Sequence, residues 1–201
     1  MEGTSIALLC MNKPQILAET VASLERTLVQ PYEVIMVDNG STDPRTLQIL
    51  AAQEAKGWKV IRNETNRGLS VGTNQGLEAG QYDFLIHLDD DCLVKTQGWN
   101  QLMRNYIVNH PEVGMVAPSR QAESIDHGPY QEIRWAMGFI WGIRKSLFDK
   151  IGGYDPQLHH QNECDMALRV RMSGFRLAGI VDFSPIHNDP GGPRSDVALA
   201  R

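Results

Sequence analysis

Residues 82–91 have the sequence YDFLIHLDDD, in which an apolar run leads directly into three consecutive aspartates, Asp89, Asp90 and Asp91. Apolar runs of this length are typical of buried β-strands. Three adjacent carboxylates repel one another, so their burial is costly unless a cation lies close by. A solvated acidic turn is the common alternative. Because the aspartates come straight after a buried strand, we favour a functional site over a turn.

Three further apolar runs precede this strand, and helical patterns separate them. The predicted strands are residues 4–10, 33–37, 58–61 and 82–88. Between them we predict a helix capped by Asn12 with Pro14 in its first turn, a second helix that opens at Asp43-Pro44, and a third over residues 68–79. Strands that alternate with helices favour a parallel sheet with helices on both faces.

The second half of the chain is less regular. We predict a helix over residues 97–109, strands over 113–117 and 138–143, and a helix over 162–173. In the last helix, Cys164, Leu168 and Met172 recur at four-residue spacing, which predicts a buried stripe. Residues 119–133 are polar and contain Gly128-Pro129, so we expect a mobile loop over the site.

Composition indicates one folded domain. The chain has 201 residues, of which 42% are hydrophobic and 21% charged, and we place the domain at residues 1–187 with a flexible, Pro- and Gly-rich tail over 188–201. We expect neither a membrane span nor a secretory signal, because both apolar patterns are missing from the sequence. The net charge of -5 argues against nonspecific affinity for nucleic acid. Three cysteines without a CxxC motif predict a reducing, cytoplasmic compartment and buried or semi-buried thiols.

The predicted topology places polar residues where such folds bind ligands. In open α/β sheets the ligand lies beyond the carboxyl ends of the strands, and here those ends carry Asn12, Asp38 and the three aspartates. Side chains two residues apart share a side of an extended backbone, so Asp89 and Asp91 can address one ligand together. Hard oxygen ligands suit Mg²⁺ or Mn²⁺, which usually also hold substrate phosphates.

Other candidate residues each have a plain structural alternative. Arg67, within Asn66-Arg67-Gly68, can meet a phosphate or lie on the surface, and His187 can be a metal ligand or a surface histidine. Glu163 stands where a helix begins and can act as a general base. Asn162 and Asp165 beside it also fit a simple capping arrangement.

Taken in order, these motifs resemble the inverting GT-A nucleotide-sugar glycosyltransferases of family 2. The resemblance covers about residues 3–187 and implies a Rossmann-like, mostly parallel sheet flanked by helices. Its motifs are VIMVDNGSTD over residues 34–43, Asn66-Arg67-Gly68 with Asn74 and Gly76, Leu88 with the three aspartates, GGYD over 152–155, NECD over 162–165 with Arg169, and His187.

The resemblance also implies roles for individual residues. Asp38 corresponds to the acidic residue that contacts the base, Asp89 points toward the ribose, and Asp91 with His187 holds the metal. Glu163 stands where the family usually has the aspartate base of a Glu-Asp pair, and Asp165 is the other catalytic candidate. The full set of nucleotide-binding candidates is Cys10, Asn12, Asp38, Asn66, Arg67, Gly68, Asn74, Asp89 and Asp90.

The sequence therefore predicts a metal-dependent glycosyltransferase that moves a sugar from a nucleotide-diphosphate donor, such as a UDP-sugar, to an acceptor hydroxyl. Mn²⁺ or Mg²⁺ is the expected cofactor, and inversion the expected outcome unless Glu163 is not placed for in-line attack. A sugar nucleotidyltransferase is one alternative, although residues 10–15 lack the glycine-rich loop of those enzymes. A sugar-nucleotide-binding module without turnover is the other. The acceptor, modified DNA included, stays open.

Overall fold

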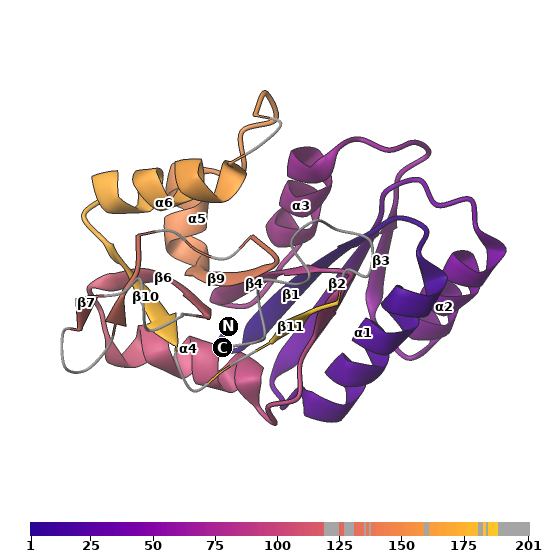
Figure 1. Ribbon diagram of the computed structural model, residues 1–201, viewed down its shortest axis with the longest axis horizontal. Coiled ribbons are helices and arrows are strands. Elements are labelled where there is room, and N and C mark those ends of the chain that lie inside the picture. Colours follow the sequence, from indigo (N-terminus) through magenta and orange to yellow (C-terminus); the bar gives the residue numbers. More distant parts are fainter. Residues whose placement is uncertain are drawn as a thin grey trace.

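The computed structural model describes residues 1–118, 125–126, 131–134, 136, 138–158, 161–180, 183 and 185–188. In this part of the chain a nine-stranded sheet has the order β3-β2-β1-β4-β9-β6-β10-β8-β7 (Figure 1). The strands are β1 (Thr4–Cys10), β2 (Tyr32–Asp38), β3 (Lys59–Arg62), β4 (Phe84–Asp89), β6 (Val113–Pro118), β7 (Ile125–Asp126), β8 (Gln131–Glu132), β9 (Ile140–Arg144) and β10 (Arg176–Ile180). A separate pair joins β5 (Cys92–Leu93) to β11 (Ile186–His187).

The sheet is mostly parallel, as the sequence predicts. Strands β3, β2, β1 and β4 run in one direction, and β9 lies antiparallel between β4 and β6. Strand β9 is hydrogen-bonded to β4 and β6, although β7 and β8 come between β6 and β9 along the chain. The architecture is therefore α/β, with the carboxyl ends of β1, β2 and β4 at one edge.

Helices cover both faces of the sheet (Figure 1). The helices are α1 (Pro14–Thr27), α2 (Pro44–Ala55), α3 (Leu69–Glu78), α4 (Trp99–Asn109), α5 (Lys145–Ile151) and α6 (Asn162–Met172). Helices α1, α2 and α4 pack on one face, and α3, α5 and α6 on the other. In β1, Ile6 and Leu8 belong to the first core and Ala7 to the second, because successive side chains of a strand point to opposite faces.

The start of α2 agrees with the prediction, whereas that of α1 differs. Asp43 caps α2, accepting a hydrogen bond from the Arg45 N–H at 2.9 Å. The residue before α1 is Lys13, which, like Asn12, has a positive φ. The Asn12 carboxamide oxygen instead accepts hydrogen bonds from the N–H groups of Thr42 and Asp43, each at 3.0 Å. Asn12 is therefore not a helix cap: it joins the end of β1 to the loop after β2.

The predicted stripe of α6 is wrong. Cys164 is exposed, and Leu168 and Met172 are 55% and 77% exposed. The helix instead buries Asn162, Met166, Ala167 and Val170. Both sets fit a helical period, and the choice between them depends on which side meets β9 and β10. The expectation of a buried or semi-buried thiol holds for Cys10 and Cys92 and fails for Cys164.

The predicted loop and tail are only partly described. Within residues 119–133, β7 and β8 pair with each other, and β8 pairs with β10, so the residues of these two strands extend the sheet. Gly128 and Pro129 lie outside the described residues, as do residues 189–201 of the predicted tail. Asn188, the first residue of that tail, donates hydrogen bonds to the Asp91 carbonyl and to Glu19. Among the helices that the structure describes, none is long and apolar enough to cross a bilayer.

Asn100 ties α4 to the start of β1. Its fully buried side chain donates to the Thr4 hydroxyl at 2.9 Å and to the Val29 carbonyl at 2.8 Å, and it accepts from the Val29 N–H at 3.1 Å. We expect Asn100→Leu to lower the free energy of unfolding by about 2–4 kcal/mol, because it removes three hydrogen bonds made by a fully buried side chain.

Urea denaturation measures this loss. Asn105→Leu, the same substitution at an exposed position of α4, is the matched control and is expected to change stability by less than about 0.5 kcal/mol. Equal stability of the two variants would show that the hydrogen bonds of Asn100 do not stabilise the fold.

Candidate active site

A cavity of about 330 Å³ opens where the carboxyl ends of β1 and β4 meet. Its wall includes five of the predicted nucleotide-binding residues, together with the predicted metal ligand Asp91. The lining residues are Leu9, Cys10, Met11, Lys13, Asn39, Asn66, Gly68, Leu69, Asp89, Asp90 and Asp91. The parallel arrangement of β1 and β4 thus brings together residues that lie up to about eighty positions apart in the sequence.

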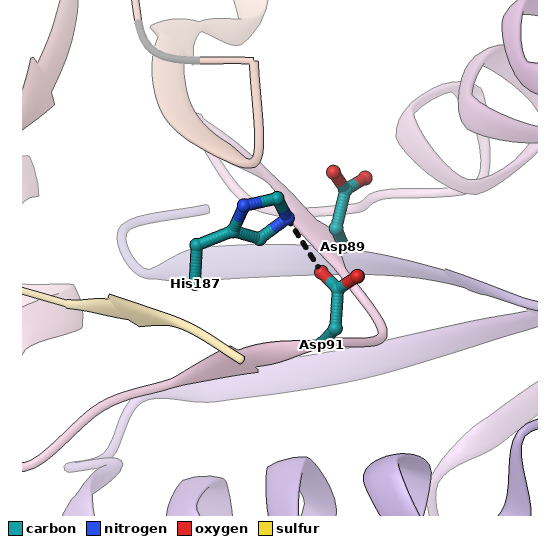
Figure 2. Close-up of side chains that lie close together, drawn as sticks. All are labelled: Asp89, Asp91 and His187. Carbon is teal, nitrogen blue, oxygen red and sulfur yellow. Dashed lines mark ion pairs between the residues drawn. The ribbon is translucent and has the colours of Figure 1, made fainter. Parts of the chain in front are cut away.

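Asp89, Asp91 and His187 form a cluster beside this cavity (Figure 2). One potential ligand atom from each lies within 4.8 Å of the others, and His187 Nε2 is 3.0 Å from Asp91 Oδ1. The antiparallel pairing of β5 with β11 sets His187 opposite Cys92, next to Asp91 along the chain. The ring of Phe139 stacks on the imidazole with centroids 4.8 Å apart, which holds it in place.

The cluster suits a hard divalent cation. Asp91 Oδ1 is buried, and among the described residues the polar group that faces it is His187 Nε2, 3.0 Å away. A buried carboxylate oxygen needs a hydrogen-bond donor or a cation beside it. Two carboxylates and one imidazole are ligands that Mn²⁺ and Mg²⁺ accept, with phosphate and water completing the shell.

The surroundings shift the pKa values of Asp90 and Asp91 in opposite directions. Burial raises the pKa of Asp90 to about 6, the nearby Lys13 ammonium opposes this rise, and the neighbouring Asp91 adds to it. Burial also acts to raise the pKa of Asp91, but His187 and Lys13 outweigh burial and hold the pKa below its usual value. The Lys13 ammonium lies 3.8 Å from Asp90 and 3.7 Å from Asp91. Lysine thus partly neutralises the aspartates.

Glu163 lies on the other side of the same strand ends. A Cβ atom placed on Gly138 would lie 2.5 Å from Glu163 Oε1, so the carboxylate covers the turn that leads into β9. The next residue of that turn, Phe139, accepts a hydrogen bond from the Asp89 N–H at 2.9 Å. Burial raises the pKa of Tyr154 well above its ordinary value, and the nearby Glu163 carboxylate adds to the rise. Glu163 therefore lies in the first turn of α6 and near β4.

Asp165 has an ion-pair partner in α6, and Asn162 is not the cap of that helix. Asp165 accepts hydrogen bonds from Arg169 at 2.6 and 2.9 Å. The Arg169 guanidinium also donates to the carbonyls of the segment that carries Gly153, which fixes the turn before Tyr154. Gln161 precedes α6, and Asn162 is the first residue of the helix, 2% exposed, so the expected Asn162 cap is wrong.

Four predicted nucleotide-binding residues lie outside the cavity wall: Asn12, Asp38, Arg67 and Asn74. Asp38 is 3% exposed, and its carboxylate accepts a hydrogen bond from the Ser41 N–H. Arg67 is exposed. Asn74 exchanges two hydrogen bonds of 2.8 Å with the backbone of Tyr154, so it joins α3 to the turn before α6. A role of these four residues in nucleotide binding stays a prediction.

Sequence reasoning missed several residues at the site. Lys13 lines the cavity, and Asn39 shapes the loop that carries Asn66: its carboxamide donates to Asn66 and accepts from the Arg67 N–H. His87, in β4, lies 3.1 Å from Asp89. The available signal for His87 was a polar residue inside an apolar strand, two positions before the first aspartate.

Comparison with known proteins now identifies the class. The model of the family described as glycosyl transferase family 2 matches residues 5–172. Poly-beta-1,6-N-acetyl-D-glucosamine synthases from Staphylococcus aureus and Staphylococcus epidermidis are 26% identical over 148 residues. This region is 73% of the present chain and 35% of those relatives, so the chain spans about a third of their length.

Solved structures show the same fold. Staphylococcus aureus TarS superposes with a TM-score of 0.76 and 19% identity over 90% of this chain and 35% of that chain. A mannosyltransferase from Pyrobaculum calidifontis, in complex with GDP-Man and Mn²⁺, superposes with a TM-score of 0.72 and 18% identity. The match covers 90% of this chain and 56% of that chain. The fold is the GT-A fold of glycosyltransferases. The chain belongs to glycosyl transferase family 2.

The raised pKa of Asp90 makes stability depend on pH. The folded-state value of about 6 exceeds the ordinary 3.8, so ionised Asp90 destabilises the metal-free fold above pH 6, and the cost disappears as pH falls toward 3.8. We expect Asp90→Asn to raise the free energy of unfolding by about 2 kcal/mol at pH 8 and by less than about 1 kcal/mol at pH 4.5.

Urea denaturation of the metal-free proteins at the two pH values measures the difference. Asp149→Asn, at a half-exposed side chain of α5 paired with Lys145, is the control and is expected to show no comparable gain. A variant less stable than the wild type at pH 8 would contradict the argument.

Proposed function

We propose that this protein transfers a sugar from a nucleotide-diphosphate donor, with UDP-sugars favoured, to an acceptor hydroxyl with inversion of configuration. The observation that carries the proposal is one edge of the sheet that holds a cavity with acidic walls, a cluster of potential metal ligands and a separate carboxylate, Glu163. The proposal gives the donor, the cation and the base distinct positions around the end of β4.

The donor proposal depends on the cavity and on the structural neighbours. Structures of TarS residues 1–349 are in complex with UDP and with UDP-GlcNAc, and the Pyrobaculum enzyme holds GDP-Man. The cavity of this chain has apolar residues such as Leu9 and Met11 beside polar ones such as Asn66, which suits a base and its sugar. Asp89 lines this cavity and is proposed to accept hydrogen bonds from a ribose.

Asp91 and His187, with Asp89, are proposed to hold Mn²⁺ or Mg²⁺. When bound, such an ion neutralises the charge that develops on the diphosphate leaving group. The chain's own contribution is to keep the ligands in place: Phe139 stacks on His187, and the Asn188 N–H donates to the Asp91 carbonyl at 2.6 Å.

Glu163 is proposed as the general base. Its carboxylate accepts the proton of the acceptor hydroxyl while that oxygen attacks the anomeric carbon from the face opposite the diphosphate. The bond to the diphosphate breaks as the new glycosidic bond forms, and the configuration inverts. The Arg169 contacts keep Asp165 occupied as an ion-pair partner, which leaves Glu163 as the carboxylate free to take this proton.

A binding module without turnover is the second candidate. One observation favours it: Asn162 replaces an acidic residue of the family motif, and its buried carboxamide oxygen has no hydrogen-bond partner among the described residues. Measured turnover of any donor would exclude this alternative.

We expect Asp91→Asn and His187→Ala each to raise the dissociation constant of UDP, measured by calorimetry with Mn²⁺ present, about tenfold or more. Without Mn²⁺, wild type and variants should bind UDP equally weakly, because the ligands act through the cation. Glu78→Gln, on the exposed face of α3, is the control. Unchanged affinities in the presence of Mn²⁺ would overturn the metal assignment.

We expect Glu163→Gln to lower turnover about 10²–10⁴-fold, because the amide keeps the shape and cannot accept the proton. The donor is first identified by screening hydrolysis of UDP- and GDP-sugars with Mn²⁺, with water as the acceptor. UDP affinity should stay within about twofold of wild type, since Glu163 lies outside the cavity wall.

The Asp165→Asn variant distinguishes the roles of Glu163 and Asp165. It breaks the ion pair with Arg169, so we expect a loss of about 1 kcal/mol in stability and less than about tenfold in turnover. A fast Glu163→Gln enzyme beside a folded but inactive Asp165→Asn enzyme would show that Asp165 is the base.

A further inference from the structure

One polar side chain in the core has no part in the chemistry described so far. His87 stands in the middle of β4, where its neighbours along the strand, Ile86 and Leu88, are fully buried apolar residues. The imidazole is itself only 1% exposed. Burying an imidazole costs more free energy than burying an apolar side chain of similar size unless both its nitrogen atoms have hydrogen-bond partners.

The imidazole meets a single polar group. His87 Nε2 lies 3.1 Å from Asp89 Oδ1, and Nδ1 has no hydrogen-bond partner among the described residues. Residues 87 and 89 share a face of the strand, so β4 itself brings the two side chains together. A carboxylate can only accept a hydrogen bond, so a hydrogen bond across this contact requires the proton on Nε2 and leaves the lone pair on Nδ1.

Aromatic side chains surround the His87 imidazole. The imidazole lies 5.4 Å from the Trp141 ring and 6.0 Å from the Tyr154 ring, measured between centroids. The Trp141 indole N–H donates to the Tyr154 hydroxyl at 2.7 Å, which locks these two rings to each other. The histidine is therefore confined from the sides, with its Nε2 facing Asp89.

We propose that His87 is a positioning residue, which acts on the donor site only through Asp89. The Nε2–H holds the Asp89 carboxylate in one orientation against the repulsion of Asp90 and Asp91, so that its second oxygen stays directed toward the cavity and the cation. The inference rests on the proposed function insofar as Asp89 contacts the donor nucleotide or its cation. It predicts that UDP affinity depends on a hydrogen-bond donor at position 87 and not on the aromatic shape of His87.

Two substitutions separate the donor from the ring. His87→Phe keeps an aromatic ring among Trp141 and Tyr154 but removes the donor, whereas His87→Gln removes the ring and keeps an N–H at similar reach. We expect His87→Phe to raise the dissociation constant of UDP with Mn²⁺ about tenfold or more, and His87→Gln to stay within about threefold of wild type.

Melting temperature distinguishes a positioning role of His87 from a purely structural one. His87→Phe is expected to melt at the wild-type temperature or above it, because it removes a buried nitrogen without a partner, while nucleotide affinity falls. The control is His110→Phe, at the opposite edge of the sheet, where a histidine also packs on a tyrosine, Tyr106, and lies near a carboxylate, Glu112. It should leave UDP affinity unchanged.

Nuclear magnetic resonance tests the hydrogen bond without any nucleotide. Long-range ¹H–¹⁵N spectra should show His87 as the Nε2–H form, with a slowly exchanging proton whose resonance moves in Asp89→Ala. Protonation on Nδ1, or a resonance that Asp89→Ala leaves in place, would overturn the inference. So would a His87→Phe protein that binds UDP as tightly as wild type, or a His87→Gln protein as weak as His87→Phe.

The two kinds of failure can be told apart. If the wild type binds neither UDP nor GDP with Mn²⁺ but the resonance responds to Asp89→Ala, the proposed donor is wrong and the positioning contact holds. If the wild type binds UDP with Mn²⁺ and His87→Phe binds equally well, the proposed function stands and the role of His87 is refuted.

Discussion

Electrostatic repulsion among Asp89, Asp90 and Asp91 at the end of β4 is the constraint on which the rest of the site depends. Asp90 and Asp91 are 8% and 6% exposed, so water screens their charges poorly. Each aspartate is met by a nitrogen: the ammonium of Lys13 for Asp90 and Asp91, the imidazole of His187 for Asp91, and that of His87 for Asp89. These groups come from the start of α1, from β11 and from β4. The backbone at Asn12 and Lys13 is correspondingly unusual, with two consecutive positive φ values that aim Lys13 at the aspartates.

The second half of the site has a different support. Glu163 stands in the first turn of α6, and α6 is joined to the turn before Tyr154 by the Arg169 guanidinium. Asn74 then joins that same turn to α3 through two hydrogen bonds with the Tyr154 backbone. The two halves meet where Asp89 and Phe139 share a hydrogen bond. Residues of the family motifs that lie outside the cavity wall, Asn74 and Asp165 among them, thus hold the carboxylate in place.

Sequence patterns predicted the elements well and their contacts less well. The strand ending in the aspartates, the start of α2 at Asp43-Pro44 and the alternation of strands and helices were all predicted, because each depends on neighbours within a few residues. The caps assigned to Asn12 and Asn162 were wrong, since their surroundings are set by distant segments. The buried face of α6 was misplaced because two apolar stripes fit the same period, and packing against β9 and β10 chose the other one.

The sequence by itself determined the α/β architecture, the acidic end of β4 and the order of motifs typical of family 2, because strand length, helical period and turn chemistry are local properties of the chain. Only the tertiary structure decided which polar residues meet. His187 reaches Asp91 through the pairing of β11 with β5, more than ninety residues away along the chain. The lysine beside the aspartates, Lys13, comes from the N-terminal part of the chain. Such contacts depend on sheet order and register, which no local pattern encodes, and they convert a row of mutually repelling carboxylates into a site that can hold a cation.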